Sequence, residues 1–232
     1  MVRFVTVLIL IVVSLVCVDS SAAQSNQKGV TKQGVVINSV PREIDKGARY
    51  LVYISGYIVA AGNTRPTSPR FGVYEYEKIL ESFKERGFVV ISEARQQSPE
   101  IVPYAEKVAA QVKQLIKAGV SPKNITVVGA SQGAWIAMLV STYVAHHDLN
   151  FVFIAACAAN DGFLKSVNLH GNTLFISERT DQPGSCQRFR DDATGINNYN
   201  AIEVNTGLKH GFLYRPMKEW IDPAVEWAQR TR

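Results

Sequence analysis

A short glycine-rich turn near the middle of the chain does most to restrict how it can fold. Residues 129–133 read Gly-Ala-Ser-Gln-Gly, the pattern G-x-S-x-G. An apolar, largely β-branched run, Ile125–Val128, precedes the turn, and a segment without proline and with no internal glycine, Ala134–His146, follows it. This order predicts a strand, a sharp turn and a helix in direct succession, with Ser131 at the turn. Glycine at 129 and 133 carries no Cβ, so the flanking stretches of chain can pass close together.

Strand-like and helix-like segments alternate through the rest of the sequence from Gly34 onward. Short apolar runs predict further strands at Val35–Asn38, Tyr50–Ser55, Phe88–Ser92, Phe151–Ala156, Thr173–Ser177 and Ala201–Val204. Apolar residues at helical spacing and glycine stops predict helices at Val73–Arg86, Ile101–Ala118 and Met217–Gln229. Strands that are apolar throughout and separated by helices are typical of a mostly parallel sheet with helices on both faces. The sequence therefore predicts an α/β fold of this kind.

Three further features of this fold follow from the sequence. A short turn joins the runs Val35–Asn38 and Tyr50–Ser55, so we expect these first two strands to be antiparallel. No long insertion lies between the helix after Ser131 and the last strand, so we expect no large lid. With 47% hydrophobic and 19% charged residues, positions 24–232 are expected to form a single domain with one sizeable core.

The first 23 residues have the composition of a secretory signal peptide. Arg3 is followed by an almost unbroken apolar stretch, Phe4–Val18, and then by the small residues Ser-Ala-Ala at 21–23. A basic start, a short apolar region and a small-x-small site predict cleavage after Ala23. The mature chain would begin at Gln24 and reside in the periplasm or outside the cell. No second such apolar run occurs, so no stable membrane insertion is expected after cleavage.

Export changes how the three cysteines are interpreted. Cys17 would leave with the signal peptide, and two thiols in an oxidising compartment favour one disulfide, Cys157–Cys186, over two buried free cysteines. Cys157 ends the predicted strand Phe151–Ala156, and Cys186 follows the predicted strand Thr173–Ser177. If these two strands are neighbours in a parallel sheet, both cysteines lie at the same edge and within reach of one another.

The charge pattern and the motifs present exclude several classes of function. The net charge of +5 comes from scattered lysines and arginines, and no basic cluster interleaved with aromatic residues indicates nucleic-acid binding. We find no phosphate-binding loop, no dinucleotide fingerprint, no paired-histidine motif and no carboxylate cluster at metal-ligand spacing. The sequence therefore predicts no cofactor and no metal.

A serine hydroxyl is a poor nucleophile on its own, so Ser131 needs a base and an orienting acid. The mature chain contains four histidines. His210 lies in the loop 207–212, after the last predicted strand and before the terminal helix, where a base that serves a turn serine is expected. His146 and His147 end the helix after Ser131 and are expected to be solvated there, and His170 stands in a turn without a recognisable partner.

Three acids could orient the histidine. Asp181 follows the predicted strand Thr173–Ser177 by a few residues, so its loop can direct the carboxylate toward the imidazole. Glu178 is closer to the strand and is the second candidate. Asp161 follows the preceding strand and is the third, although a turn role before Gly162 is the simpler interpretation. The favoured set is Ser131, Asp181 and His210, in that order along the chain.

Stabilising a developing oxyanion requires two backbone N–H groups close to Ser131. The residue after the serine, Gln132, is expected to supply one, and the turn after the predicted strand Tyr50–Ser55 the other, from Gly56 or Tyr57.

With these residues in place, the chain resembles the α/β-hydrolase family over most of its mature length. The stretch 71–76, Phe-Gly-Val-Tyr-Glu-Tyr, and the run 125–133 resemble a group of small bacterial α/β-hydrolases without a settled substrate. Such proteins usually carry His-Gly after the strand that supplies the second oxyanion donor, whereas this sequence has Ser55-Gly56. The resemblance implies an α/β-hydrolase fold without a large lid.

These observations favour an exported serine hydrolase that cleaves a carboxylic ester through an acyl-enzyme. An open site suits a small-molecule or solvent-accessible ester, and thioester or amide cleavage stays open. The alternative is a protein of another class, a non-catalytic binding protein that retained the fold. The reason to consider it is Ser55, which stands before Gly56 where similar proteins usually carry a histidine. The sequence does not determine the oligomeric state.

Overall fold

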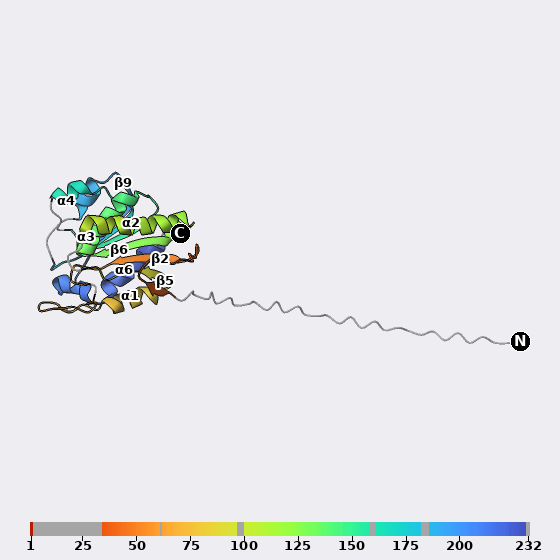
Figure 1. Ribbon diagram of the computed structural model, residues 1–232, viewed down its shortest axis with the longest axis horizontal. Helices are drawn as coiled ribbons and strands as arrows, with labels where there is room; N and C mark the ends of the chain where they lie inside the picture. The colour runs from red at the N-terminus through yellow and green to blue at the C-terminus, as the bar shows by residue number, and fades with distance from the viewer. Residues whose placement is uncertain (2–33, 61, 97–99, 158–160, 182–185, 231–232) are drawn as a thin grey trace. The chain divides into compact units, whose positions relative to one another are not determined.

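The computed structural model describes residues 1, 34–60, 62–96, 100–157, 161–181 and 186–230. The predicted signal peptide, with Cys17 and the cleavage site before Gln24, lies outside these ranges apart from its first residue. Residues Lys32–Arg232 group into one compact unit, and the elements below all belong to it (Figure 1). No helix in the described ranges is both long and apolar enough to span a bilayer.

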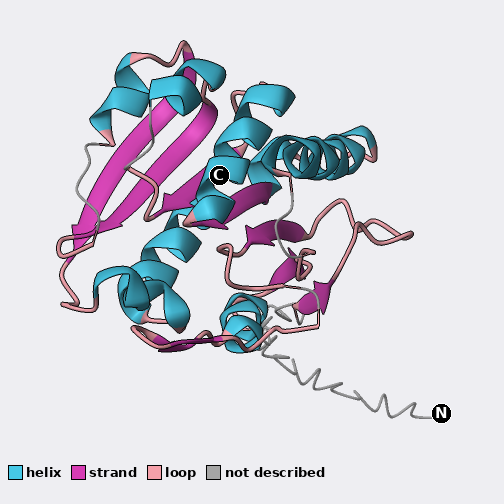
Figure 2. Cartoon of the chain, turned by 60° about the vertical axis from the view of Figure 1, so that its left-hand side comes forward, coloured by secondary structure: helices cyan, strands magenta, loops and turns pink. Residues whose placement is uncertain are grey.

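A seven-stranded sheet forms the centre of this unit (Figure 2). Its strands in chain order are β1 Val35–Ile37, β2 Arg49–Ile54, β5 Phe88–Ile91, β6 Ile125–Ala130, β7 Asn150–Ile154, β8 His170–Glu178 and β9 Gly195–Val204. Their spatial order is β1-β5-β2-β6-β7-β8-β9, and every neighbouring pair is parallel. The predicted α/β class with a parallel sheet is confirmed.

The expectation that the first two strands are antiparallel is wrong. β5 lies between β1 and β2, and both run parallel to it. The connecting segment 38–48 is long enough to return the chain to the same end of the sheet, as a parallel crossover requires. The expected helix from Val73 also begins later, because Gly72–Val73 forms strand β4 of a small antiparallel hairpin with β3, Thr67–Ser68.

Helices cover both faces of the sheet. They are α1 Tyr76–Lys84, α2 Ile101–Lys117, α3 Gln132–Val144, α4 Asp161–Ser166, α5 Gln187–Asp191 and α6 Lys218–Arg230, with short 3₁₀ helices η1 Pro122–Asn124 and η2 Lys209–Tyr214. The apolar sides of α2 and α3 share one core cluster with the sheet. Those of α1 and α6 share the other. Within the described ranges, the only helices between α3 and β9 are the short α4 and α5, so no large lid is present there.

The central strands are apolar on both sides because both sides are covered. In β2, Tyr50 and Val52 face the α2–α3 cluster, whereas Leu51 and Tyr53 face the α1–α6 cluster. Every residue of β6 is buried. This explains why the sequence shows continuous hydrophobic runs without the polar alternation of a half-exposed sheet.

The chain order fixes where a site can form. From β2 the chain moves to β5 on one side, and it then crosses to β6 on the other side of β2. Ligand sites in parallel sheets form at the carboxyl ends of strands where the winding direction reverses. Ser131 follows β6 and Gly56 follows β2 at this point of the sheet.

Candidate active site

Ser131 occupies a strained turn between β6 and α3. Its backbone has φ 54° and ψ −122°, a conformation that residues with a side chain rarely adopt. The glycines on either side permit this turn: a Cβ at Gly129 would collide with the Gly133 carbonyl oxygen, and one at Gly133 with the Ile54 carbonyl oxygen. The Ser131 N–H is bound to the Ile154 carbonyl at 2.8 Å, which ties the turn to β7.

His210 links the serine to an aspartate. Its Nε2 lies 2.9 Å from the Ser131 Oγ, and its Nδ1 lies 2.7 Å from an Asp181 carboxylate oxygen. The side chains of His210 and Asp181 are only 22% and 9% exposed, so little water competes for these contacts. With Nδ1 protonated toward the carboxylate, the lone pair of Nε2 faces the serine hydroxyl and can accept its proton. The structure therefore brings together the three residues favoured from the sequence.

The other histidines lie away from Ser131. His146 and His147 follow the end of α3, just before β7 begins, with their rings stacked at 5.2 Å. His170 opens β8, and its Nδ1 faces the Asn168 carbonyl at 2.8 Å. All three stand near the amino ends of the strands, opposite to the turn that carries Ser131. Of the alternative acids, Asp161 begins α4, and its side chain lies outside what the structure describes.

The second alternative acid, Glu178, accepts hydrogen bonds from two loops. Its carboxylate is buried and accepts hydrogen bonds from the backbone N–H groups of Thr180, Thr206 and Gly207, at 2.6, 3.0 and 3.0 Å. The hydroxyls of Thr180 and Thr206 add two more. Burial alone would raise the pKa of the Glu178 carboxyl, but these donors outweigh it and hold the pKa below its usual value.

These hydrogen bonds join two loops. Thr180 precedes Asp181, whereas Thr206 and Gly207 belong to the segment that leads to His210. The Asp181 N–H also donates to the Glu178 carbonyl at 3.0 Å. Glu178 thus fastens the loop that carries the acid to the loop that carries the histidine.

The β3–β4 hairpin brings an aromatic side chain next to the histidine. The Phe71 ring lies 6.3 Å from the His210 ring and 5.4 Å from the Tyr214 ring. A cavity of about 270 Å³ adjoins this group and is lined by Phe71, His210 and Asp181 together with Arg70, Thr180 and Lys209. The hairpin therefore forms one wall beside the acid and the histidine.

Two segments meet next to Ser131 where a developing oxyanion could be bound. Gln132 is the first residue of α3, and its backbone N–H has no acceptor among the described residues. Gly56 approaches Ser131 so closely that a Cβ on the glycine would lie 3.6 Å from the serine Cβ. The Gly56 backbone also interacts with the buried phenol of Tyr74, and this contact opposes the rise in the tyrosine pKa that burial causes.

A residue that sequence reasoning missed connects these two segments. Arg95 follows β5, is only 3% exposed, and donates from Nη2 to the Ser55 carbonyl oxygen at 2.8 Å. The same nitrogen lies 3.4 Å from the Gln132 side-chain oxygen. One guanidinium thus bridges the residue before Gly56 and the residue after Ser131.

The charge of Arg95 has no acidic partner in the described ranges. Its Nε and Nη1 are buried without a hydrogen-bond partner there, and its guanidinium lies over the Tyr104 ring at 5.2 Å. Burial lowers the pKa of this guanidinium. One signal in the sequence could have identified Arg95. It is a charged residue just beyond the predicted strand Phe88–Ser92, at the edge of the sheet where Ser131 lies.

Potential metal ligands gather elsewhere in the described part. His146, His147 and Asp148 could place one ligand atom each within 4.8 Å of one another. They lie beyond the end of α3, remote from the turn that begins this helix.

A disulfide joins Cys157 and Cys186, with their Cα atoms 4.7 Å apart. β7 and β8 are neighbours, as the prediction of this bond assumed. Cys186 immediately precedes α5, so the bond fixes the chain beyond the acid loop to the end of β7.

Comparison with known proteins identifies the fold. No protein-family model and no curated protein matches the chain. SOBER1 from Arabidopsis thaliana matches over 80% of this chain and 99% of its own, with a TM-score of 0.53 and 11% identity. Est1E from Butyrivibrio proteoclasticus matches over 83% and 92%, with a TM-score of 0.52 and 12% identity. A protein of unknown function from Agrobacterium tumefaciens, described as a candidate α/β hydrolase, matches over 81% and 88%, with a TM-score of 0.50 and 17% identity.

At such low identities these matches concern the fold alone. The chain has the α/β-hydrolase fold.

Proposed function

We propose that this protein is a serine hydrolase that cleaves small carboxylic esters through an acyl-enzyme. The observation that carries the proposal is the hydrogen-bonded series from Asp181 through His210 to Ser131, at 2.7 and 2.9 Å. A serine held in a strained turn at a helix N-terminus, with an oriented imidazole beside it, is the arrangement that activates a hydroxyl for attack.

The reaction follows from this geometry. Ser131 Oγ attacks the acyl carbon while its proton passes to Nε2 of His210. The tetrahedral intermediate then expels the alcohol, which takes that proton from Nε2. A water molecule attacks the acyl-enzyme in the same way, and His210 returns the proton to Ser131 as the carboxylic acid leaves. Asp181 keeps the imidazole oriented and stabilises its charged form throughout.

The oxyanion is assigned to two backbone N–H groups. Gln132 provides one from the first turn of α3, where the helix dipole adds to it. The turn at Gly56 and Tyr57 provides the other, from the backbone N–H of one of these two residues. Arg95 acts as a positioning residue that holds both segments at the correct separation.

The surroundings support a small substrate. The cavity beside His210 and Asp181 measures about 270 Å³, and the helices that the structure describes between α3 and β9 are short. An ester is preferred over an amide because an alcohol leaves more readily than an amine, and a thioester, whose thiol also leaves readily, is the alternative. We also propose that residues 1–23 are a cleaved signal peptide and that the chain acts outside the cytoplasm, where the Cys157–Cys186 disulfide would persist.

A fluorophosphonate probe tests the activity, because it reacts only with an activated serine. We expect the purified protein to be labelled once, at Ser131, and to hydrolyse p-nitrophenyl esters with a preference for short acyl chains. Ser131→Ala is expected to abolish both signals while the circular dichroism spectrum is retained. Failure of the folded wild-type protein to react with the probe and with every ester would overturn the proposal and favour a non-catalytic binding protein.

A further inference from the structure

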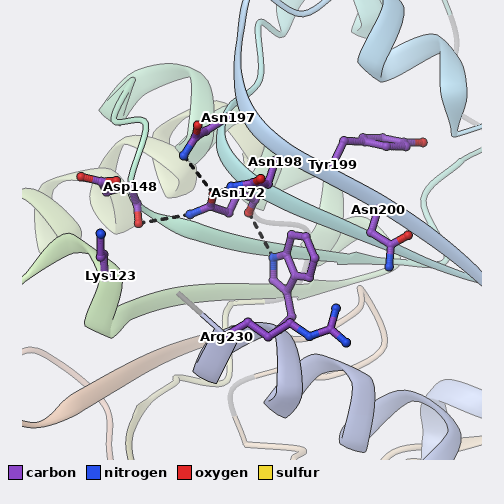
Figure 3. A pocket seen from close by; sticks show the side chains of 9 residues that line it. Lys123, Asp148, Asn172, Asn197, Asn198, Tyr199, Asn200 and Arg230 are labelled. Carbon is purple, nitrogen blue, oxygen red and sulfur yellow. Dashed lines mark hydrogen bonds between the residues drawn. The ribbon is translucent and has the colours of Figure 1, made fainter. Parts of the chain in front are cut away.

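A second cavity lies at the opposite end of the sheet from Ser131. It measures about 500 Å³, within the range of roughly 300–1,000 Å³ that is typical of small-molecule sites. Asn172 near the start of β8, Asn197 and Asn198 near the start of β9, and Asn200 in the middle of β9 contribute to its walls (Figure 3). Asn172, Asn197 and Asn198 belong to the amino-terminal parts of their strands. The cavity is therefore separate from the proposed active site at the carboxyl ends.

An irregularity in the sheet gives this cavity its polar wall. Gly171 pairs with Ile196 but Asn172 pairs with Asn198, so Asn197 is an extra residue in β9. Successive side chains of a regular strand point to opposite faces. Here the bulge lets both Asn197 and Asn198 reach one acceptor, the Oδ1 of Asn172, at 3.3 and 2.6 Å. Bulges are rare between parallel strands and often redirect a side chain toward a site.

Buried neighbours fix the orientation of the Asn172 side-chain amide. This side chain is 2% exposed and donates to the Asn150 side-chain oxygen at 3.1 Å. The Trp227 indole N–H donates to the Asn172 carbonyl oxygen at 3.3 Å and holds α6 against the same strand. A buried polar layer thus determines how the exposed amides of Asn197 and Asn198 are oriented.

The orientation leaves hydrogen-bonding groups facing the cavity. Asn197 and Asn198 each use the NH₂ group toward Asn172, and the described residues provide no partner for either Oδ1. Asn200 uses its Oδ1 for the Ala201 N–H at 3.0 Å, and its NH₂ group has no partner in the same ranges. Fixed acceptors and a donor side by side match a ligand whose groups both donate and accept, as hydroxyls do.

The charged residues at this cavity favour a neutral ligand. Asp148 stands among them together with Lys123 and Arg230, so both signs are present (Figure 3). The Asp148 carboxylate would repel an anion. A neutral molecule with several hydroxyls could instead donate a hydrogen bond to Asp148 and accept hydrogen bonds from Lys123 and Arg230. We propose that this cavity is a binding site for a neutral carbohydrate, held mainly by the amides of Asn197, Asn198 and Asn200.

Such a site would attach the protein to a glycan while the edge that carries Ser131 stays open. The inference does not depend on the proposed esterase activity, because none of its residues contacts Ser131, His210 or Asp181.

Isothermal titration of the purified full chain tests the inference. The probes are neutral cello-, xylo- and chito-oligosaccharides, with inorganic phosphate as the anionic comparison. We expect at least one oligosaccharide to bind saturably and phosphate not to bind. Asn197→Ala and Asn198→Ala are each expected to weaken binding roughly three- to tenfold, as the loss of one neutral hydrogen bond implies. These positions are exposed, so both variants are expected to fold, whereas replacement of the buried Asn172 endangers folding.

Matched variants separate the cavity from the rest of the surface. Asn38→Ala removes an exposed asparagine at the end of β1 and is expected to bind as wild type. Ser131→Ala is also expected to bind as wild type, which distinguishes this site from the active site. The inference is overturned if no oligosaccharide of the panel binds, if phosphate alone binds, or if oligosaccharide binding persists in the Asn197→Ala/Asn198→Ala double variant.

Discussion

The guanidinium of Arg95 donates a hydrogen bond to the backbone carbonyl of Ser55 at 2.8 Å, directly before the glycine that lies against Ser131. Similar hydrolases usually carry a histidine at the position of Ser55, and the Ser55 Oγ has no hydrogen-bond partner among the described residues. In this chain Arg95, which follows β5, supports the turn at Ser55 and Gly56 in place of a larger side chain within the turn. Arg95 is also a buried cation without an acidic partner among the described residues, so it adds positive potential close to the place where negative charge would develop in the proposed reaction.

Replacing Arg95 by methionine is therefore expected to lower kcat while KM changes little. Removal of a direct oxyanion donor typically costs about 10²–10³ in kcat, and we expect roughly 10- to 100-fold for a residue that acts through such donors. Steady-state kinetics on a p-nitrophenyl ester measures the split between kcat and KM. Arg65→Met, at an exposed arginine, serves as the matched control. An unchanged kcat in folded Arg95→Met would rule out the positioning role.

The sequence was sufficient to predict the parallel sheet, the disulfide, and the serine, acid and histidine that the structure brings together. These predictions depend on local signals and chain order: Ser131 stands between a strand and a helix, and Asp181 and His210 follow late strands. Arg95 could not be assigned because its role depends on β5 lying beside β2, which chain order does not reveal. The antiparallel pairing of β1 and β2 failed for the same reason, since β5 inserts between them. The bulge at Asn197 depends on register, for which the sequence gives no local signal.

The two carboxylates near the histidine are expected to differ in their effect on catalysis. Asp181→Asn preserves the shape but removes the charge that orients His210, and the comparable change in a serine protease triad costs about 10⁴-fold in kcat. Glu178→Gln is expected to cost far less, because Glu178 contacts the loops and not the imidazole. Measured kcat values for both variants decide the assignment, which would be reversed if Glu178→Gln proved the more damaging change.

Glu178 is expected instead to make stability depend on pH. Its folded-state pKa is lowered, so its contribution is fully present above the unfolded-state pKa of about 4.3 and is lost as pH falls toward the lower folded-state value. Urea unfolding from pH 7 to pH 3 is expected to show a steeper loss for wild type than for Glu178→Gln. At pH 7 the variant is expected to be less stable by roughly 1–3 kcal/mol, because several buried donors lose a charged acceptor. Parallel curves for the two proteins would show that Glu178 does not contribute in this way.

The Cys157–Cys186 disulfide is expected to support the active site as well as global stability. The two cysteines are 29 positions apart, and closing a loop of this length stabilises the folded state by roughly 3–4 kcal/mol in the chain-entropy description. Cys186 lies five positions beyond Asp181, so the bond also restricts the segment that carries the acid. Mild reduction is therefore expected to lower esterase activity while the circular dichroism signal is still native. The matched variant Cys157→Ser/Cys186→Ser is expected to show the same loss without reductant and to be insensitive to it. Loss of activity only in step with global unfolding would limit the disulfide to a role in stability.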